Sequence, residues 1–296
     1  MKYLVTGSAG LIGTQLVSDL IQSGETVYSC YHTKITQNGI STQLDLLNFD
    51  KISTILQKLK PDVIIHLAAL TDVEKCELDS NLALSINAKS SEIIAKESKK
   101  FGSYLIYLST DYIFDGKKGM YDESDLANPI NQYGKSKFLG EKNIESFASK
   151  WSILRTSTPF GFHSTKKTFP IWVLENIQNK KKFNALDDQF TSPTYVVNLS
   201  KMILEISLKK LEGIFHLSGS TRISRYEFGK KILKKLNIDD SLLNPVKTNS
   251  MQWHAKRPFD SSLNVTKANS ILTTKPFSID ESLIDYIPRL KNSFSL

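Results

Sequence analysis

Gly7-Ser8-Ala9-Gly10-Leu11-Ile12-Gly13 is the stretch that decides the fold of this 296-residue chain. It follows an apolar run at 3–6 and opens an amphipathic pattern at 11–23, which predicts a strand, a tight turn and a helix. The three glycines let the backbone approach a pyrophosphate closely, and the helix N-terminus offers free N–H groups to its charge. The stretch therefore predicts a dinucleotide-binding turn rather than a merely structural one.

Short apolar runs alternate with helical patterns through the first half of the chain. We expect strands at Tyr3–Thr6, Thr26–Tyr31, Val63–Leu67, Tyr104–Ser109 and Ile153–Arg155. Helices are expected at Leu11–Ser23, Phe49–Leu59, Asn81–Lys100 and Tyr133–Ser149. Strands that alternate with helices indicate an α/β fold with a doubly wound parallel sheet, here of six or seven strands.

The alternation breaks after residue 155. Residues 156–170 are rich in Thr, Ser, Pro and Gly, which is typical of a long functional loop. We expect a strand at Ile214–Leu217 and helices at Phe169–Asn179, Val196–Lys210, Arg225–Leu236 and Asp280–Ile287. The pattern predicts a dinucleotide-binding domain of residues 1–160, completed by segments around 195–218. A smaller, mostly helical substrate-binding domain would comprise residues 161–194 and 219–296.

Composition and charge narrow the class of protein. The longest apolar run, 63–70, is too short to span a bilayer, and the chain begins too close to the glycine turn for a signal peptide. Two cysteines form neither a disulfide framework nor a metal quartet, so a reduced, cytoplasmic protein is expected. Residues 1–150 carry a net charge of −2 (16 Lys/Arg, 18 Asp/Glu) and residues 151–296 carry +10 (22 and 12). An anionic ligand or nucleic acid would suit the basic half, and a solvated basic surface is the simpler interpretation.

The second expected strand bears on the choice of dinucleotide. Folds that bind NAD usually place an acid at the end of this strand, but here it ends Cys30-Tyr31-His32-Thr33-Lys34. A cation such as Lys34 could meet a 2′-phosphate, so NADP(H) is favoured and NAD(H) is the alternative. Asp45 and Leu46 lie where such folds often contact adenine. His66, with no metal partner or nucleophile nearby in sequence, is expected in the core.

Tyr133 and Lys137 stand four residues apart where a helix is expected to begin, so they share one face of it. The Lys137 charge can lower the cost of ionising the Tyr133 phenol, which would let it pass a proton near neutral pH. Such a pair alone is a weak signal, since many helices carry one on a solvated face. The glycine turn upstream strengthens it.

Several motifs together resemble one family. They are the glycine turn, His66–Glu77, Ile86-Asn87-Ala88, Leu108–Gly116, Asn131–Lys137, Asp188–Thr194 and Arg257–Leu263. The chain is similar, nearly end to end, to the extended short-chain dehydrogenase/reductase superfamily, and specifically to the dTDP-4-dehydrorhamnose reductase family. The most family-specific element is Ser-Thr-Asp-Tyr-x-Phe-Asp-Gly at 109–116. The resemblance implies a Rossmann fold and reduction, with NAD(P)H, of the C4 ketone of a dTDP-4-keto-6-deoxyhexose. The substrate it implies is dTDP-4-dehydrorhamnose, which would be converted to dTDP-rhamnose.

The resemblance also implies roles for cofactor-binding residues. The pyrophosphate would be held at Gly7, Gly10, Leu11, Ile12 and Gly13. The adenosine and ribose path would be lined by Ala68, Ala69, Leu70 and Thr71, with Asn87 supporting this region. Lys137 would hold the nicotinamide ribose and tune Tyr133.

The remaining implied roles concern the substrate. Tyr133 would be the proton donor, and Thr110 would hydrogen-bond the substrate carbonyl with Asp111 beside it. Arg257 is a candidate contact for the diphosphate. Thr158 stands where bacterial members commonly place a Trp that packs on the sugar, which puts the identity of the sugar in doubt. We predict no metal and leave open whether the chain forms a homodimer.

Three other functions are weighed. A nucleotide-sugar 4-epimerase or 4,6-dehydratase of the same superfamily would return the hydride, but Tyr112 follows Thr110-Asp111 where many dehydratases have Glu. A relative of this family is a non-catalytic subunit that binds dinucleotide, and the intact Thr110, Tyr133 and Lys137 set argues against that function. Nucleic-acid binding has only the basic half in its favour. A nucleotide-sugar substrate is therefore expected, with neither nucleic acid nor a membrane as a partner.

Overall fold

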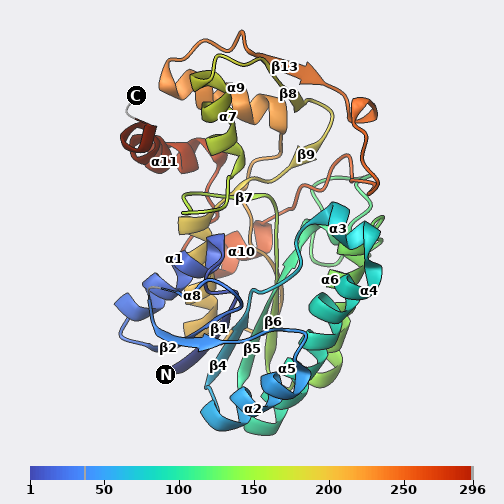
Figure 1. Ribbon diagram of the computed structural model, residues 1–296, viewed down its shortest axis with the longest axis vertical. Coiled ribbons are helices and arrows are strands. Elements are labelled where there is room, and N and C mark those ends of the chain that lie inside the picture. The colour runs from blue at the N-terminus through green and yellow to red at the C-terminus, as the bar shows by residue number, and fades with distance from the viewer. Residues whose placement is uncertain (37, 295–296) are drawn as a thin grey trace.

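A parallel sheet of seven strands lies at the centre of the structure, a computed structural model that describes residues 1–36 and 38–294 (Figure 1). The strands are β1 (Lys2–Thr6), β2 (Thr26–Tyr31), β3 (Ile40–Gln43), β4 (Val63–His66), β5 (Tyr104–Thr110), β6 (Trp151–Thr156) and β11 (Gly213–His216). Their order is β11-β6-β5-β4-β1-β2-β3, and each neighbouring pair is parallel. The predicted doubly wound α/β fold is confirmed, because the chain leaves β1 in one direction for β2 and β3 and returns in the other for β4 to β6.

Helices cover both faces of the sheet (Figure 1). Tyr3 and Val5 of β1 face a core shared with α1 (Leu11–Gln22) and α8 (Val196–Lys209). Leu4, between them, faces the opposite core, to which α2 (Phe49–Leu59), α5 (Ser90–Phe101) and α6 (Gln132–Phe147) contribute. This alternation is the period of two that a strand imposes. Burying each such Leu or Ile side chain contributes roughly 1.5–3 kcal/mol to stability.

One long helical segment differs from the expected single helix at Asn81–Lys100. It consists of α4 (Ser80–Leu84), a π-helix η1 (Ser85–Lys89) and α5, and it follows the short α3 (Val73–Leu78). A π-helix holds one extra residue per turn and is frequent at functional sites. Here it contains the buried Asn87.

A second group of elements packs beyond the carboxyl ends of the strands, at the top of Figure 1. It has its own apolar cores, built by α7 (Phe169–Gln178), α9 (Arg225–Leu236), α11 (Ile279–Phe294), β8 (Phe183–Leu186) and β13 (Leu243–Val246). The short pairs β7 (Pro159–Phe160) with β10 (Thr194–Tyr195) and β9 (Phe190–Thr191) with β12 (Ile223–Ser224) lie at its base. The helix α10 (Thr266–Ile271) instead contacts β11 of the central sheet. From the sequence we expected one domain of residues 1–160 completed by residues 195–218, and a second of residues 161–194 and 219–296. This division of the chain stays a prediction.

Several short elements of the structure were not expected from the sequence. The strand β3 was missed because its residues, Ile-Ser-Thr-Gln, are polar and mostly exposed at the sheet edge. The expected loop 156–170 contains β7, and the second half holds further short strands, β8, β9, β10, β12 and β13, besides the expected strand at Ile214–Leu217.

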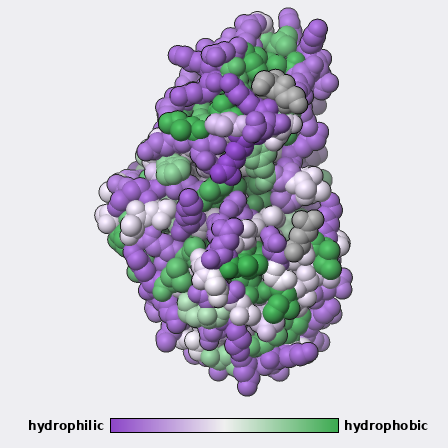
Figure 2. Space-filling model, turned by 90° about the vertical axis from the view of Figure 1, so that its left-hand side faces the viewer, coloured by the Kyte–Doolittle hydropathy of each residue, from purple (hydrophilic) through white to green (hydrophobic). Residues whose placement is uncertain are grey.

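The described residues contain no helix that combines the length and the apolar character needed to cross a membrane. Figure 2, which views the molecule from the left-hand side of Figure 1, shows mostly hydrophilic side chains with apolar ones in scattered groups.

Candidate active site

The glycine turn joins β1 to α1 at the carboxyl edge of the sheet. Gly7 has a φ of +70°, which favours glycine, and its carbonyl accepts from Gly10 N at 2.9 Å. The helix then starts from Gly10 without a side-chain cap and without an acidic residue in its first turn. Its first N–H groups and the positive end of its dipole are therefore available to an anion.

The space above the turn depends on the absence of side chains. A Cβ at Gly13 would lie 2.2 Å from the Gly7 carbonyl oxygen, and one at Gly7 would lie 2.8 Å from Ala68 N. Both distances are too short for real atoms. The turn therefore fits the close backbone approach that a dinucleotide pyrophosphate requires.

Asn87 fixes the loop after β4. Its Oδ1 accepts from Leu70 N at 2.8 Å, and its Nδ2 donates to Leu70 O at 3.0 Å and to Ser136 Oγ at 2.9 Å. Asn87 thereby ties this loop to α6, the supporting role expected from the resemblance. His66 is buried between Thr6 and Ser91, and burial lowers its pKa to about 3, so its expected place in the core is confirmed.

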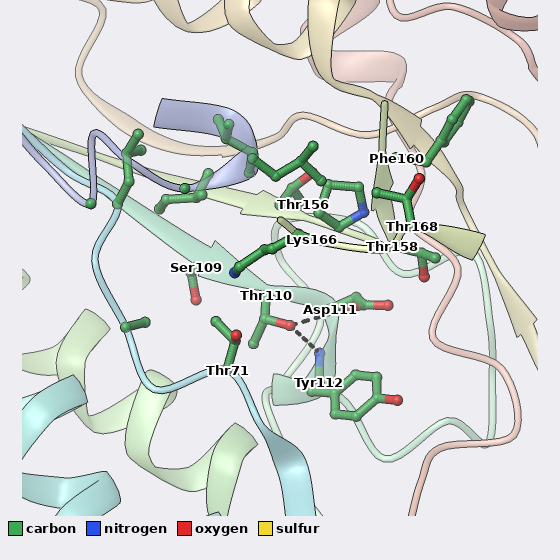
Figure 3. Close-up of a pocket in the computed structure, with 18 of the residues that line it drawn as sticks. Thr71, Ser109, Thr110, Asp111, Tyr112, Thr156, Thr158, Phe160, Lys166 and Thr168 are labelled. Atoms are coloured by element: carbon green, nitrogen blue, oxygen red, sulfur yellow. Dashed lines mark hydrogen bonds between the residues drawn. The ribbon is translucent and has the colours of Figure 1, made fainter. Parts of the chain in front are cut away.

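Thr110 and Asp111 lie at the end of β5 and the start of the short 3₁₀-helix η2 (Asp111–Ile113). Thr110 Oγ1 donates to Asp111 Oδ1 at 3.0 Å and accepts from Tyr112 N at 3.2 Å (Figure 3). Burial raises the pKa of the Asp111 carboxyl, although three hydroxyl donors oppose the rise.

Tyr133 and Lys137 occupy the first turns of α6, as predicted. Asn131 caps this helix by accepting from Gly134 N at 2.8 Å, which is the role that Asn serves well at a helix start. Its amide nitrogen also donates to Lys256 O at 2.8 Å, so one side chain holds the helix and the 251–260 segment together.

Burial shifts the pKa of both members of the Tyr133–Lys137 pair. Burial raises the pKa of Tyr133, and contact with the Thr110 hydroxyl opposes this rise only in part. Lys137 Nζ donates to Leu108 O at 2.7 Å and lies 3.9 Å from the Tyr107 ring centre. Burial lowers the pKa of Lys137 to about 7. Burial is the largest influence on the phenol, and the expectation that Lys137 lowers the cost of ionising Tyr133 stays a prediction.

A cavity of about 410 Å³ brings most of the predicted residues together. It lies between the glycine turn, the ends of β4, β5 and β6, and the 166–169 segment (Figure 3). The predicted residues that line it are Gly7, Gly10, Leu11, Ile12, Gly13, Ala69, Thr71, Thr110, Asp111, Tyr133, Lys137 and Thr158. Thr158 has a φ of +42°, an uncommon conformation for a β-branched residue and one that often marks a functional site.

Six predicted residues do not line this cavity. The Asp45 carboxylate accepts from Leu47 N at 2.9 Å and lies 3.7 Å from His32 Nε2, and Leu46 packs in the core beside α2. Arg257 is paired with Glu74 at 2.9 Å and stacks 3.7 Å from the Trp253 ring centre. The others are Ala68, Leu70 and Asn87, which support the loop after β4. Their binding roles stay predictions.

Other residues of the cavity were not singled out from the sequence. Lys166, Lys167 and Arg225 contribute positive charge, and Figure 3 shows the Lys166 side chain extending into the space. Asp111 is the acidic residue of the lining, so the cavity suits an anionic ligand. His163 Nε2 lies 3.0 Å from Ala9 O, which ties the Lys166 segment to the glycine turn. In the sequence, only the net positive charge of residues 151–296 had indicated that basic side chains could meet an anionic ligand.

Among residues 1–36 and 38–294, no group of three or more His, Cys, Asp or Glu side chains is arranged to hold a metal ion. Both cysteines, Cys30 and Cys76, are buried free thiols.

The parallel sheet, the uncapped glycine turn on α1 and the tyrosine–lysine pair in one cavity define a dinucleotide-dependent oxidoreductase of the short-chain dehydrogenase/reductase class. Comparison with known proteins narrows this class. A family model described as RmlD substrate binding domain matches residues 1–292. A dTDP-4-dehydrorhamnose reductase of Aggregatibacter actinomycetemcomitans is 31% identical over 287 residues, covering 93% of this chain and 94% of that protein.

Two further relatives bear on function. The crystal structure of a dTDP-4-dehydrorhamnose reductase from Bacillus anthracis, in complex with NADP, is 31% identical with a TM-score of 0.87, covering 97% of this chain and 99% of that one. The beta subunit of methionine adenosyltransferase 2 of Xenopus tropicalis is 29% identical over 277 residues, 91% of this chain and 82% of that protein. The chain belongs to the dTDP-4-dehydrorhamnose reductase family of NAD(P)-dependent oxidoreductases.

Proposed function

We propose that this chain reduces the C4 ketone of a dTDP-4-keto-6-deoxyhexose, converting dTDP-4-dehydrorhamnose to dTDP-rhamnose. The observation that carries the proposal is that Tyr133 and Lys137, one helical turn apart on α6, share a cavity with the uncapped N-terminus of α1. A proton donor thereby lies in the same space as an anion-binding turn. The names of the reductase relatives supply the substrate class.

NADP(H) is the favoured cofactor and NAD(H) the second candidate. The NADP complex of the B. anthracis relative and the lack of an acid at the end of β2 support NADP(H). The turn at Gly7–Gly13 would hold the pyrophosphate, and the loop at 68–71 would lie along the adenosine and ribose. The reduced nicotinamide, when bound, supplies the hydride.

Tyr133 would protonate the ketone oxygen as negative charge grows there. Its raised pKa keeps the phenol protonated at neutral pH, which is the state that a general acid needs. Lys137 would hold the nicotinamide ribose once it turns from Leu108 O, and a bound anion would favour its charged form. General acid help of this kind contributes roughly 10²–10⁴-fold to rate.

Lys166 and Arg225 are the cations that we assign to the substrate diphosphate. Both line the cavity, and Arg225 stands at the first position of α9, with its guanidinium 5.6 Å from the Phe169 ring centre. Lys167 is less suited, because it is paired with Glu175 at 2.9 Å. Thr158, which lies between β6 and β7, would face the sugar.

Two alternatives are tested by the same experiment. A 4-epimerase or 4,6-dehydratase would consume no net NADPH, because such enzymes return the hydride. A non-catalytic dinucleotide-binding subunit is the other alternative. The likeness to the beta subunit of methionine adenosyltransferase 2 favours it.

Purified protein is incubated with NADPH or NADH and a panel of 4-keto-6-deoxy nucleotide sugars, and the loss of absorbance at 340 nm is followed while the product is identified. Stoichiometric oxidation of NADPH with formation of a 4-hydroxy sugar is expected. Product without cofactor oxidation would identify an epimerase or dehydratase. Tight NADPH binding without turnover on any sugar would support the regulatory alternative.

The proposal extends to partners and location. Many basic side chains of the second half are paired with acids, such as Lys231 with Asp280 and Arg222 with Asp260, which leaves little reason to propose a nucleic-acid surface.

We propose a cytoplasmic protein that forms a homodimer, for which exposed Leu78, Leu84 and Leu139 on the neighbouring helices α3, α4 and α6 offer apolar surface. Light scattering coupled to gel filtration would give the mass of the assembly.

A further inference from the structure

The loop at 161–168 reaches from the second group of elements to the glycine turn. It follows β7 and ends where α7 begins, and its two ends are joined because Thr168 Oγ1 donates to Gly161 O at 3.0 Å. Residues 164–167, at its tip, are exposed. A short exposed loop keeps one position only where specific contacts hold it. We call this loop the strap.

His163 is the residue that ties the strap to the glycine turn. Its Nδ1 accepts from the backbone N–H groups of Lys166, at 3.0 Å, and Thr165, at 3.2 Å. Because a backbone N–H group can only donate, Nδ1 carries no proton and the neutral ring carries its proton on Nε2. Nε2 therefore donates to the Ala9 carbonyl, 3.0 Å away. One imidazole thus shapes the strap and binds it to the turn.

The strap stands between two cavities. On one side, residues 166–168 line the cavity of about 410 Å³ together with residues 10–13 of the glycine turn. On the other side, residues 162–165 line a second cavity, of about 450 Å³, together with residues 8–9 of the same turn. The turn and the strap are each shared between the two cavities, and they meet at the hydrogen bond between His163 and Ala9. A dinucleotide whose pyrophosphate lies on the turn would have the strap across it, and it could leave only after the strap has moved.

The strap also carries a cation of the candidate active site. Lys166 extends into the first cavity (Figure 3), and it is one of the two cations that we assign to the substrate diphosphate. The backbone N–H of Lys166 is also a donor to His163 Nδ1. The residue that would meet the substrate is therefore bonded directly to the residue that holds the turn. A diphosphate bound to Lys166 would favour the position of the strap in which His163 reaches Ala9.

We propose that His163 is a positioning residue that holds the strap over the bound dinucleotide, and that a nucleoside diphosphate bound to Lys166 keeps the strap closed. The inference rests on the proposed function and deepens it, because it sets the order in which the ligands leave. The sugar nucleotide departs first, the strap then opens, and the oxidised cofactor follows.

The rate at which NADPH leaves the protein tests this proposal without any turnover. Protein loaded with NADPH is mixed with excess NADP⁺ in a stopped-flow instrument, and the loss of the fluorescence of bound NADPH gives the dissociation rate constant. The probe for the diphosphate is dTDP, which has no ketone to reduce. We expect saturating dTDP to slow the release of NADPH from the wild type by about fivefold or more. Equal rates with and without bound dTDP would overturn the proposed closure by the diphosphate.

His163→Ala should speed the release of NADPH by about threefold or more in the absence of dTDP, because the hydrogen bond between the strap and the turn is lost. His163→Gln should restore much of the wild-type rate, since its amide nitrogen can donate to the Ala9 carbonyl. The urea midpoint of cofactor-free His163→Ala should equal that of the wild type, which separates an effect on the strap from a loss of global stability.

Ser164→Ala is the matched control for His163→Ala. Ser164 is the next residue of the strap and lines the same second cavity, but the hydrogen bond to the Ala9 carbonyl is made by His163. Its NADPH release should match the wild type within about twofold. An unchanged rate in His163→Ala, or an equal increase in Ser164→Ala, would overturn the role of His163.

Lys166→Met tests the link between the diphosphate and the strap. In this variant Arg225, which is not part of the strap, would still bind the diphosphate of saturating dTDP. The ratio of the NADPH release rates without and with dTDP should therefore fall toward one. A ratio as large as in the wild type would show that the diphosphate does not act through the strap. If dTDP does not bind to the wild type, the proposed substrate is wrong, and the rates of His163→Ala without dTDP still decide the role of His163.

Discussion

Glu141 and Arg155 form a bidentate ion pair in the interior, with Arg155 Nε 3.1 Å from Oε1 and Nη2 2.8 Å from Oε2 of Glu141. Their side chains are 1% and 4% exposed. The pair joins α6 to β6, and so it holds the helix of Tyr133 against the sheet. Glu141 also follows Lys137 by one turn, where its charge opposes the fall in the pKa of Lys137.

Glu141→Ala is expected to lower the free energy of unfolding by about 3–5 kcal/mol, because it leaves the Arg155 charge buried without a partner. Urea denaturation measures this. The double variant Glu141→Leu/Arg155→Met should recover most of the loss, since the desolvated charge is then gone. A single variant as stable as the wild type would show that water reaches Arg155.

The stability of the cofactor-free protein should depend on Lys137 and pH. The folded protein releases this proton near pH 7, and the unfolded chain releases it near pH 10.4. Between these values the unfolded chain binds more protons, so the contribution of Lys137 to stability rises with pH, by up to about 1.4 kcal/mol per unit. Urea denaturation from pH 7 to 9 should therefore show a steeper rise for the wild type than for Lys137→Met. Parallel curves would mean that Lys137 keeps an ordinary pKa.

Tyr133→Phe should reduce kcat by about two decades, because the phenyl ring keeps the shape of the side chain but has no proton to give. The NADPH Kd, measured by fluorescence, should stay within about twofold. Near-normal turnover in this variant would mean that a group other than Tyr133 is the proton donor.

Gly13→Ala should abolish NADPH binding or weaken it by at least about a hundredfold, since its Cβ would lie 2.2 Å from the Gly7 carbonyl oxygen and displace the turn. Gly102→Ala is the control, because a Cβ there meets open space at a positive φ and costs only backbone strain. Fluorescence titration with NADPH separates the two variants. Equal affinities in both would exclude the turn as the pyrophosphate site.

Arg225→Ala should raise the KM for the nucleotide sugar about tenfold while leaving the NADPH Kd unchanged, if its guanidinium meets the diphosphate. Arg257→Ala is the informative comparison, since Arg257 is paired with Glu74 outside the cavity lining. Steady-state kinetics at varied sugar concentration test both. A larger increase in KM for Arg257→Ala would instead support Arg257 as the diphosphate contact, as expected from the sequence.

The sequence predicted the central elements because their signals are local. The buried strands β1, β2, β4, β5 and β6 have apolar runs, and the glycine turn has a fixed spacing, so their places could be predicted to within two residues. The strand β3 could not, since its exposed, polar residues pair with the sheet through backbone groups alone.

The charges of the site could not be assigned because they depend on distant partners. Glu74 neutralises Arg257 from 183 positions away, and no local pattern indicates this pair. Arg225 lies on the first turn of a helix that is otherwise typical of a surface helix, and its position over the cavity depends on how the second group of elements packs. The desolvation of Tyr133 is likewise a property of the assembled cavity and not of the Tyr-x-x-x-Lys spacing.

The π-helix at Ser85–Lys89 makes this region intolerant of changes in length. Removing one residue there would restore a regular α-helix and take away the wider turn on which Asn87 stands, while the flanking helices would keep nearly the same faces. Asn87 would then turn away from Leu70 and Ser136, which its amide now holds at 2.8–3.0 Å. Homologues of different chain length should therefore accept insertions and deletions elsewhere and keep the residue count of this segment constant.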